Sequence, residues 1–327
     1  MEQEPQDFEN RLDLSALHES IQRIREQFST ILIGQTAQID MLLCALLSNG
    51  HVLIEGVPGL AKTLMSRTLA QCINARFSRI QFTPDLMPTD VLGTTIFNPK
   101  SQEFSYHKGP VFSNIVLIDE INRAPAKTQA ALFEVMEERT VTNSGTTWRM
   151  EEPFFVMATQ NPVEHEGTYR LPEAQVDRFL FKLEIGYPEL EEEVRILEAH
   201  HSRPAFQALE KLEPAITKEA VLEARQLITK VHVEKPLMEY ITSIVAGTRN
   251  HKSISLGASP RASIAILTGA KAFAAIQGRD FITPEDVRYI LLPALRHRIV
   301  LSAEAEMEGR KTDRVINSIA DTVDVPR

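Results

Sequence analysis

The run from Gly56 to Thr63 has the residue types and spacing of a phosphate-binding loop. Such a loop turns sharply, so that successive backbone N–H groups and a helix N-terminus face the phosphates. In this pattern Lys62 reaches the β- and γ-phosphates and the Thr63 hydroxyl reaches Mg²⁺. Ala61 replaces the usual second glycine, and we expect it to begin the helix without a positive φ. A glycine turn that merely caps a helix is the alternative interpretation.

A second run, from Asn114 to Glu120, reads as an apolar strand that ends in two carboxylates, Asp119 and Glu120. In open α/β sheets ligands sit at the carboxyl ends of the strands, so we expect Asp119 to face the same crevice as the loop. Asp119 can then hold Mg²⁺, directly or through water, and Glu120 can orient and polarise an attacking water. Together the two motifs indicate nucleotide hydrolysis.

The elements that would position these motifs read as a parallel five-stranded α/β sheet. Apolar runs without alternation indicate strands that are covered on both faces. The expected strands are residues 51–55, 77–82, 115–118, 154–158 and 180–184. Apolar spacing of three and four residues predicts helices at residues 15–28, 35–47, 62–73 and 127–138.

Beyond residue 187 the pattern changes to one helix after another. The expected helices are residues 191–201, 218–229, 237–249, 261–276 and 284–296. We therefore predict a nucleotide-binding α/β domain over residues 1–187 and an all-helical domain over residues 188–327.

Two segments of the sheet domain fit neither a core strand nor a helix. Residues 94–108 read as two short extended pieces, and residues 139–150 read as a hairpin that turns at residues 143–145. Both are expected to project from the domain as insertions. These segments contain or adjoin Trp148 and the basic residues Lys108, Arg139 and Arg149. Such residues could contact either a substrate or another subunit, and both roles remain open.

Composition narrows the classes of partner. The 327 residues carry a formal charge of −9, which disfavours nucleic acid as a partner. The first ten residues show no basic, apolar leader, and no apolar run reaches the ~20 residues that span a bilayer, so we expect a cytoplasmic protein without membrane insertion. Cys44 and Cys72 read as small buried hydrophobes. Residues 164–166 and 200–201 lack a complete ligand set for a metal.

Five motifs in order resemble the MoxR family of AAA+ ATPases, in the helix-2-insert clade related to magnesium chelatase ATPase subunits. The motifs are Gly34-Gln35, the loop from Gly56 to Thr63, Asp119 to Ala124, Ala158 to Pro162, and Leu171 to Phe179. The resemblance runs from about residue 30 to the end of the chain. It implies a P-loop AAA+ sheet domain followed by a helical lid, with ATP and Mg²⁺ as ligands.

The resemblance also implies roles for residues outside the loop. Asn161 takes the place of sensor 1, which hydrogen-bonds the γ-phosphate or the water, although a turn residue before Pro162 is the alternative. Arg178 takes the place of an arginine that reaches the neighbouring subunit's nucleotide, with Arg170 as a rival. Arg261 takes the place of sensor 2. A surface arginine is the alternative for each.

The motifs and the resemblance together assign the following residues. Catalytic roles fall to Lys62, Glu120, Asn161 and Arg178, and Mg²⁺ binding to Thr63 and Asp119. Nucleotide contacts fall to Gly34, Gln35, Gly56, Val57, Pro58, Gly59, Leu60, Ala61, Lys62, Thr63, Leu64 and Arg261.

The function that the resemblance implies is chaperone-like remodelling or activation of a protein client by a homo-oligomeric ring, expected as a hexamer. A von Willebrand factor A domain protein is the partner type expected. A nucleic-acid motor and a nucleotide-gated adaptor without turnover are the alternatives. The acidic charge argues against the first of these, and Glu120 argues against the second. The preference for ATP over GTP rests on the resemblance alone.

Overall fold

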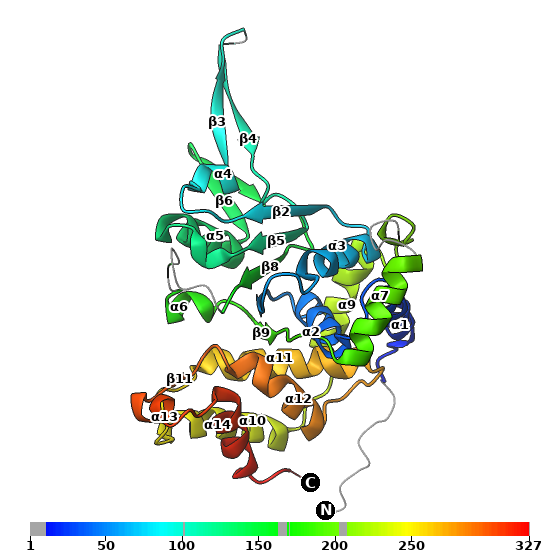
Figure 1. The fold of residues 1–327 in the computed structure, drawn as a ribbon, viewed down its shortest axis with the longest axis vertical. Helices are drawn as coiled ribbons and strands as arrows, with labels where there is room; N and C mark the ends of the chain where they lie inside the picture. The colour runs from blue at the N-terminus through cyan, green and yellow to red at the C-terminus, as the bar shows by residue number, and fades with distance from the viewer. Residues whose placement is uncertain (1–10, 101, 163–168, 170, 203–207, 327) are drawn as a thin grey trace, which may run out of the picture.

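The computed structural model describes residues 11–326, apart from 101, 163–168, 170 and 203–207. Its centre is a parallel five-stranded sheet with the strand order β2-β5-β8-β1-β9 (Figure 1). The strands are β1 (Val52–Glu55), β2 (Phe77–Gln81), β5 (Ile115–Asp119), β8 (Phe155–Gln160) and β9 (Phe181–Glu184). The predicted sheet is confirmed, with strand ends that differ from expectation by one or two residues.

Both faces of the sheet are covered, which explains why its strands are apolar without alternation. In β5, Ile115 and Leu117 belong to one hydrophobic cluster and Val116 and Ile118 to another. The first cluster includes α1 (Ser15–Ser29), α2 (Thr36–Leu47) and α3 (Lys62–Cys72). The second cluster includes α4 (Pro88–Leu92) and α5 (Ala126–Glu138). Successive strand residues point to opposite faces, so the central strands β1, β5 and β8 contribute to both clusters.

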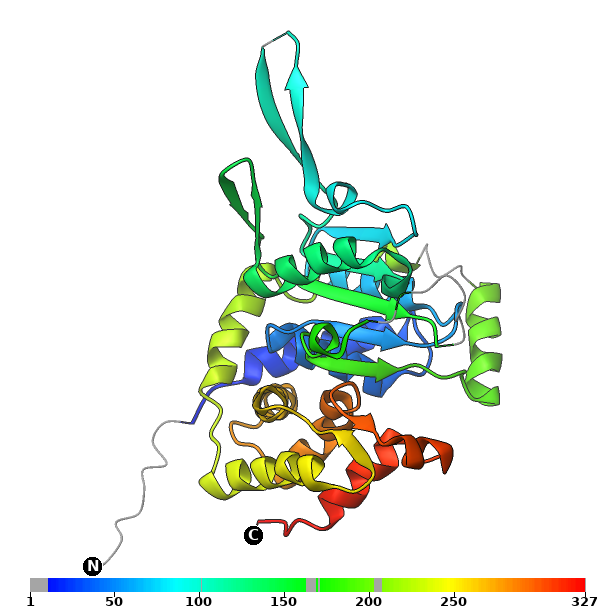
Figure 2. The same cartoon turned by 90° about the vertical axis from the view of Figure 1, so that its left-hand side faces the viewer.

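Most of the C-terminal part of the chain lies beside β9, the outermost strand, and packs against α1 and α2 (Figures 1 and 2). Its helices are α7 (Leu190–Ser202), α9 (Lys218–Thr229), α10 (Lys235–Asn250), α11 (Pro260–Ile276), α12 (Pro284–Leu295), α13 (Ala303–Met307) and α14 (Thr312–Asp321). A single hydrophobic cluster continues from α1 and α2 into α9, α10, α11 and α12. The domain boundary near residue 188 stays a prediction.

The expectation of an entirely helical second part is wrong in one respect. β10 (Ile254–Leu256) and β11 (Val300–Leu301) form a two-stranded antiparallel ladder. Ser255 Oγ donates hydrogen bonds to the carbonyl oxygens of Val300 and Leu301. These strands have three and two residues, too few for a hydropathy period to reveal them.

Two hairpins project from the sheet, as the sequence predicts (Figure 1). One pairs β3 (Gly93–Asn98) with β4 (Glu103–Lys108), and the other pairs β6 (Thr140–Asn143) with β7 (Thr146–Arg149). The second hairpin contacts the base of the first, where the Tyr106 and Trp148 rings stack with their centres 5.5 Å apart and Thr95 Oγ1 donates to Asn143 Oδ1 at 3.0 Å. The two hairpins are therefore joined to each other.

Candidate nucleotide site

The loop after β1 forms the phosphate-binding turn that its sequence predicts. Gly59 has a φ of +89°, and apart from its chain neighbours no described residue comes within 4 Å of the position that a Cβ would occupy there. Ala61 has a φ of 55° and is the N-cap of α3, so the expectation that this position needs no positive φ is wrong. A left-handed residue at this point turns the chain into the helix, and for alanine it costs roughly 1–2 kcal/mol.

Lys62 is the first residue of α3, and its ammonium group donates a hydrogen bond to the Gly56 carbonyl oxygen. Burial lowers the pKa of Lys62, while the nearby carboxylates of Asp119, Glu120 and Glu55 act in the opposite direction. The ammonium group therefore lies inside the loop, where a phosphate oxygen could replace the carbonyl oxygen as its partner.

The acidic pair lies in the same pocket as the loop, as predicted. This pocket has a volume of about 400 Å³. It is lined by Pro58, Gly59, Leu60, Ala61, Lys62, Thr63, Leu64, Arg79, Gln81, Asp119, Glu120, Thr159 and Asn161. The structure thus brings the loop, both carboxylates and the predicted sensor, Asn161, together at the carboxyl ends of β1, β5 and β8.

Thr159, at the end of β8, fixes the two carboxylate-bearing residues relative to each other. Its hydroxyl donates to Asp119 Oδ1 at 3.2 Å and accepts a hydrogen bond from the Glu120 backbone N–H at 3.0 Å. Thr159 is 3% exposed, so this link is shielded from water. Sequence reasoning passed over Thr159, although it stands two residues before Asn161 in the same motif.

The Glu120 carboxylate is held from two sides. Gln81, the last residue of β2, donates from Nε2 to Glu120 Oε2 at 2.8 Å, and Arg123 Nε lies 3.0 Å from the same oxygen. Gln81 was also missed by sequence reasoning. Its signal is the alternation of β2, in which Phe77, Arg79 and Gln81 share the face that looks toward α3.

The donor set beside the loop fits a magnesium ion. The Thr63 hydroxyl and the Asp119 carboxylate line one pocket, and oxygen ligands of this kind are those that Mg²⁺ prefers. A cationic group already lies against Asp119, because Arg79 Nε is 2.5 Å from Asp119 Oδ2. The position therefore accommodates positive charge.

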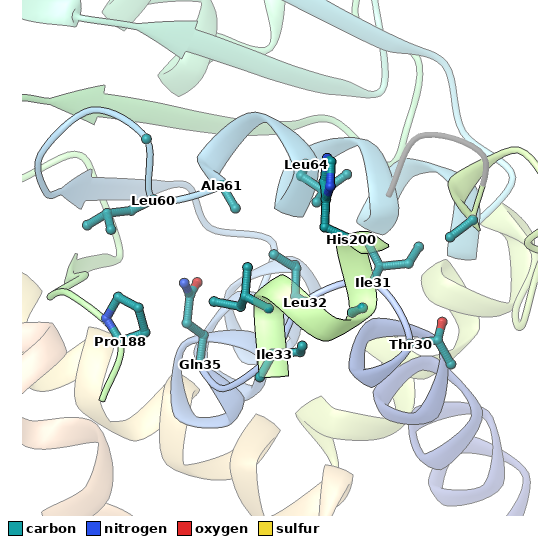
Figure 3. Close-up of a pocket in the computed structure, with 14 residues that line it drawn as sticks. Thr30, Ile31, Leu32, Ile33, Gln35, Leu60, Ala61, Leu64, Pro188 and His200 are labelled. Carbon is teal, nitrogen blue, oxygen red and sulfur yellow. The ribbon is translucent and has the colours of Figure 1, made fainter. Parts of the chain in front are cut away.

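An apolar pocket of about 400 Å³ adjoins the phosphate loop (Figure 3). It is lined by Thr30, Ile31, Leu32, Ile33, Gln35, Gly59, Leu60, Ala61, Leu64, Pro188, Ile196, Ala199, His200 and Ala208. Because Gly59, Leu60, Ala61 and Leu64 line both pockets, one ligand could place phosphates in the first and a flat apolar group in the second. The wall from α7, with Ile196, Ala199 and His200, was not predicted.

Four predicted contact residues lie outside the linings of both pockets, namely Gly34, Gly56, Val57 and Arg261. Gly34 has a φ of +73° and lies against the Glu192 carboxylate. Gly56 contributes its carbonyl oxygen to Lys62, and the side chain of Val57 packs against the main hydrophobic cluster. The first three residues shape the surroundings of the pockets.

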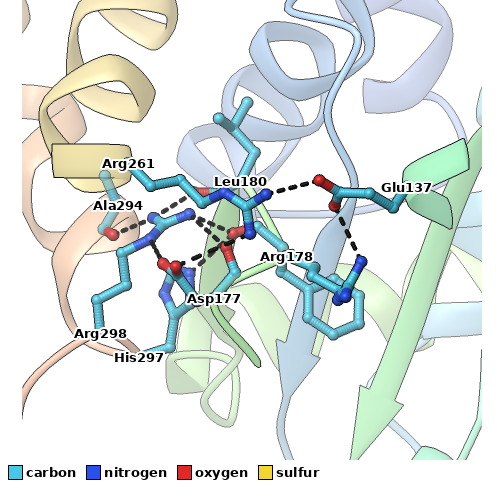
Figure 4. A network of polar contacts seen from close by, with 9 residues as sticks. Glu137, Asp177, Arg178, Leu180, Arg261, Ala294, His297 and Arg298 are labelled. Carbon is cyan, nitrogen blue, oxygen red and sulfur yellow. Dashed lines mark hydrogen bonds and ion pairs between the residues drawn. The ribbon is translucent and has the colours of Figure 1, made fainter. Parts of the chain in front are cut away.

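Arg178 and Arg261 meet in a separate polar network (Figure 4). Glu137 bridges them, with Oε2 3.2 Å from Arg178 Nη1 and Oε1 2.6 Å from Arg261 Nη2. Asp177 lies 3.9 Å from Arg261 Nη1 and accepts a hydrogen bond from Arg298 Nε at 2.6 Å. Sequence reasoning identified the two arginines but not the residues that hold them.

Arg298 joins the C-terminal part of the chain to the segment that carries Arg178. Its buried guanidinium donates to backbone carbonyl oxygens of Asp177, Phe179 and Leu180, just before β9, and of Ala294 in α12. The Arg298 side chain is 3% exposed. Burial lowers its pKa, and the hydrogen bond and charge of Asp177 act in the opposite direction.

This network lies at the amino ends of the parallel strands, whereas the phosphate loop lies at their carboxyl ends. The Leu180 N–H donates to the carbonyl oxygen of His51, the residue before β1, and His51 Nε2 lies 3.1 Å from the Met136 carbonyl oxygen. Arg178 and Glu137 are therefore at the amino ends of the strands, whereas the loop follows the carboxyl end of β1. The structure does not bring Arg178 or Arg261 to the loop of its own chain.

The other sequence expectations have mixed outcomes. Arg170 and the run 164–166 lie outside the described residues. No group of three or more His, Cys, Asp or Glu side chains in the described part of the chain could hold a metal ion. Cys44 and Cys72 are buried and free, and burial raises the pKa of Cys72 to about 12. Within the described ranges, no helix is long and apolar enough to cross a membrane.

The site combines a phosphate loop after β1, an acidic pair at the end of β5 and a polar residue after β8 in one parallel sheet. This combination defines a P-loop nucleotide hydrolase. Comparison with known proteins agrees. Residues 51–181 match the model of the ATPase family associated with various cellular activities (AAA), and residues 246–319 match that of the AAA lid domain.

Full-length relatives narrow the class to a family. YeaC of Bacillus subtilis is 48% identical over 95% of this chain and 96% of its own. Chaperone MoxR1 of Mycobacterium tuberculosis is 43% identical over 96% of this chain and 84% of its own. The crystal structure of a protein from Cytophaga hutchinsonii has a TM-score of 0.88 and 42% identity, covering 95% of this chain and 97% of that one. The chain belongs to the MoxR family of AAA ATPases.

Proposed function

We propose that the chain is a Mg²⁺-dependent ATPase whose active site is completed by a second copy of the chain. One observation carries this proposal: the phosphate loop and the arginines Arg178 and Arg261 lie at opposite edges of one sheet. Copies arranged head to tail would bring the arginine edge of one copy to the loop of the next. Such contacts close into a ring when the rotation between copies allows it, and the family resemblance favours a hexamer.

The loop edge carries the binding and water-activating groups of the proposed reaction. Lys62 and the loop N–H groups bind the phosphates, and Asn161 hydrogen-bonds the γ-phosphate or the attacking water. Glu120 orients that water and accepts its proton. Thr63 and Asp119 would hold Mg²⁺, which would supply positive charge to the phosphate oxygens.

The arginine edge carries the groups that respond to a neighbour's nucleotide. In the single chain Glu137 holds both arginines, so each would exchange this carboxylate for phosphate oxygens when the neighbour binds ATP. An arginine supplied in this way can change the rate of phosphoryl transfer by about 10³–10⁵. Hydrolysis would then depend on assembly.

The experiment that tests this proposal mixes two inactive variants. Lys62→Ala lacks the phosphate contact and Arg178→Ala lacks the arginine, so neither chain alone should turn over ATP. In mixed assemblies some interfaces combine an intact loop with an intact Arg178, and activity should return in part. Mixing two batches of Lys62→Ala is the control. The absence of recovery in assemblies shown to be mixed would contradict the shared site.

We further propose that the ATPase acts on a protein client in a chaperone-like way, which the name of the Mycobacterium tuberculosis relative supports. The two joined hairpins project from the sheet (Figure 1), and the β3–β4 hairpin exposes Ile96, Phe97 and Phe104. A client with a von Willebrand factor A domain is the form that we expect. Glu120→Gln, held in the ATP state, should retain such a client in a pull-down, and Glu120→Gln with Lys62→Ala should not.

A further inference from the structure

Arg79 makes a close ion pair with the predicted metal-binding carboxylate. Its Nε lies 2.5 Å from Asp119 Oδ2. The Arg79 side chain is 49% exposed and the Asp119 side chain is 12% exposed, so the pair reaches from solvent to the floor of the pocket. Both residues line the pocket together with Lys62 and Thr63.

The fold aims Arg79 at this carboxylate. β2 is the edge strand beside β5, and in their register Arg79 lies opposite Leu117 while Gln81 lies opposite Asp119. Phe77, two residues before Arg79, contacts the guanidinium of Arg67 on α3, at 5.6 Å from Arg67 Cζ to the ring centre. This face of β2 therefore looks toward the helix that begins at Lys62, and the long Arg79 side chain extends along the strand to Asp119.

The two carboxylate oxygens of Asp119 have different partners. Oδ1 accepts the hydrogen bond of the buried Thr159 hydroxyl, which also fixes the Glu120 backbone. Oδ2 has the Arg79 guanidinium. A cation that approaches from the pocket therefore meets the oxygen that Arg79 holds.

We propose that Arg79 is a positioning residue that keeps Asp119 in place without metal and that must leave Asp119 when Mg²⁺ binds. This inference rests on the proposed ATPase function. Two cations on one carboxylate repel each other, so Arg79 and the metal exclude each other at Oδ2. A released Arg79 remains at the pocket wall beside Lys62, facing the phosphates.

The proposal predicts a competition that can be measured by binding alone. The affinity of a fluorescent ATP analogue would be measured for the wild type, Arg79→Ala and Arg79→Lys. The Mg²⁺ concentration would run from none, with a chelator present, to the millimolar range. An ion pair with one exposed partner is worth roughly 0.2–1 kcal/mol, so Arg79→Ala should lower the Mg²⁺ concentration at half effect by about 1.5- to 5-fold. Arg79→Lys keeps the charge and should fall between the other two.

Arg76→Ala is the matched control. Arg76 lies just before β2, at the other end of the strand, and its Nη2 pairs with Glu151 Oε2 at 2.5 Å. It is 63% exposed, so its loss removes an arginine and an ion pair without touching the pocket. Its Mg²⁺ dependence should match that of the wild type.

A Mg²⁺ dependence in Arg79→Ala that equals the control, or that shifts to higher Mg²⁺, would overturn the proposal. Thermal unfolding with Mg²⁺ and no nucleotide gives a second readout, in which Arg79→Ala should be stabilised at lower Mg²⁺ than the wild type. If the wild type binds the ATP analogue with no response to Mg²⁺, the ATPase proposal fails instead. The two failures are thus distinguishable.

Discussion

The carboxyl ends of the strands form the loop edge of the sheet, and their amino ends form the arginine edge. These two edges carry the two halves of the proposed site, and they are built differently. At the carboxyl edge, the groups come from short contiguous motifs on neighbouring strands, and the pocket is open to solvent beside Lys62 and Glu120. At the amino edge, Arg178 and Arg261 are held by Glu137 and by a buried arginine, Arg298. The carboxyl edge therefore presents a pocket to a ligand, whereas the amino edge holds its arginines in ion pairs.

This difference separates chemistry from support. At the loop edge, Lys62 and Glu120 line a pocket and are only partly buried. The arginine edge ties the lid to the sheet through Arg298, which bonds to four carbonyl oxygens and to the Asp177 carboxylate. We therefore expect substitutions at the loop edge to change catalysis more than stability, and the buried part of the arginine edge to do the reverse.

Arg178→Ala should have the largest effect on rate. If Arg178 serves a neighbour's nucleotide, turnover should fall by about 10³–10⁵ while ATP affinity changes little. Steady-state ATPase rates and ATP binding would both be measured. Arg310→Ala is the control, because Arg310 pairs with Glu308 away from this network. A loss of ATP affinity with turnover retained would place Arg178 in a binding role and break the comparison.

Glu120→Gln should come next. The amide keeps the shape but cannot accept a proton, so turnover should fall by about 10²–10⁴ with ATP binding kept. Single-turnover hydrolysis separates the chemical step from binding. Glu134→Gln, an exposed change on α5, is the control. Substantial hydrolysis by Glu120→Gln would show that another group activates the water.

Arg298→Ala tests the supporting role of the amino edge. Removal of a buried guanidinium leaves Asp177 and several carbonyl oxygens without their partner, so the free energy of unfolding should fall by about 3–5 kcal/mol. Urea unfolding measures this change. Lys62→Ala, at the open edge, should stay within about 1 kcal/mol of the wild type. Equal losses in the two variants would contradict the division between the edges.

The smallest effect expected is a pH dependence from His51, next to the amino edge. Its Nδ1 accepts the Val156 N–H at 3.0 Å, and burial, aided by Arg139 and Arg225, lowers the pKa of His51 to about 3. Below the unfolded pKa near 6.5 the unfolded chain binds a proton that the folded chain does not. The contribution of His51 to the free energy of unfolding is therefore fully present above pH 6.5. It is lost by up to about 1.4 kcal/mol per pH unit as the pH falls toward the folded-state pKa of about 3.

Unfolding by urea at several pH values between 7 and 5 tests this pH dependence. His51→Gln should flatten the slope, because glutamine does not titrate, and His107→Gln on the exposed hairpin should leave it unchanged. Buried His297, whose pKa is also lowered by burial, retains a similar contribution in both variants. An unchanged slope in His51→Gln would refute the role of His51.

Sequence patterns predicted most of the sheet and of the loop edge. The strand that ends in Asp119 and the turn before Lys62 follow from residues that are contiguous, and local sterics and hydropathy act over such distances. Ala61 shows where this reasoning stopped, because its left-handed φ depends on how the loop enters α3. The two-stranded ladder of β10 and β11 was missed because its strands are too short to show a period.

Contacts between side chains that are far apart in the sequence depended on the tertiary structure alone. Arg79 meets Asp119 through the register of β2 with β5, and the wall of the apolar pocket depends on where α7 packs. Glu137 reaches Arg178 and Arg261 because α5, the segment before β9 and α11 converge at one edge. By itself the sequence determined which groups could bind and cleave a nucleotide, since each motif is local. Which of them share a pocket depends on parallel strands that all end at one edge, and this is a property of the folded sheet.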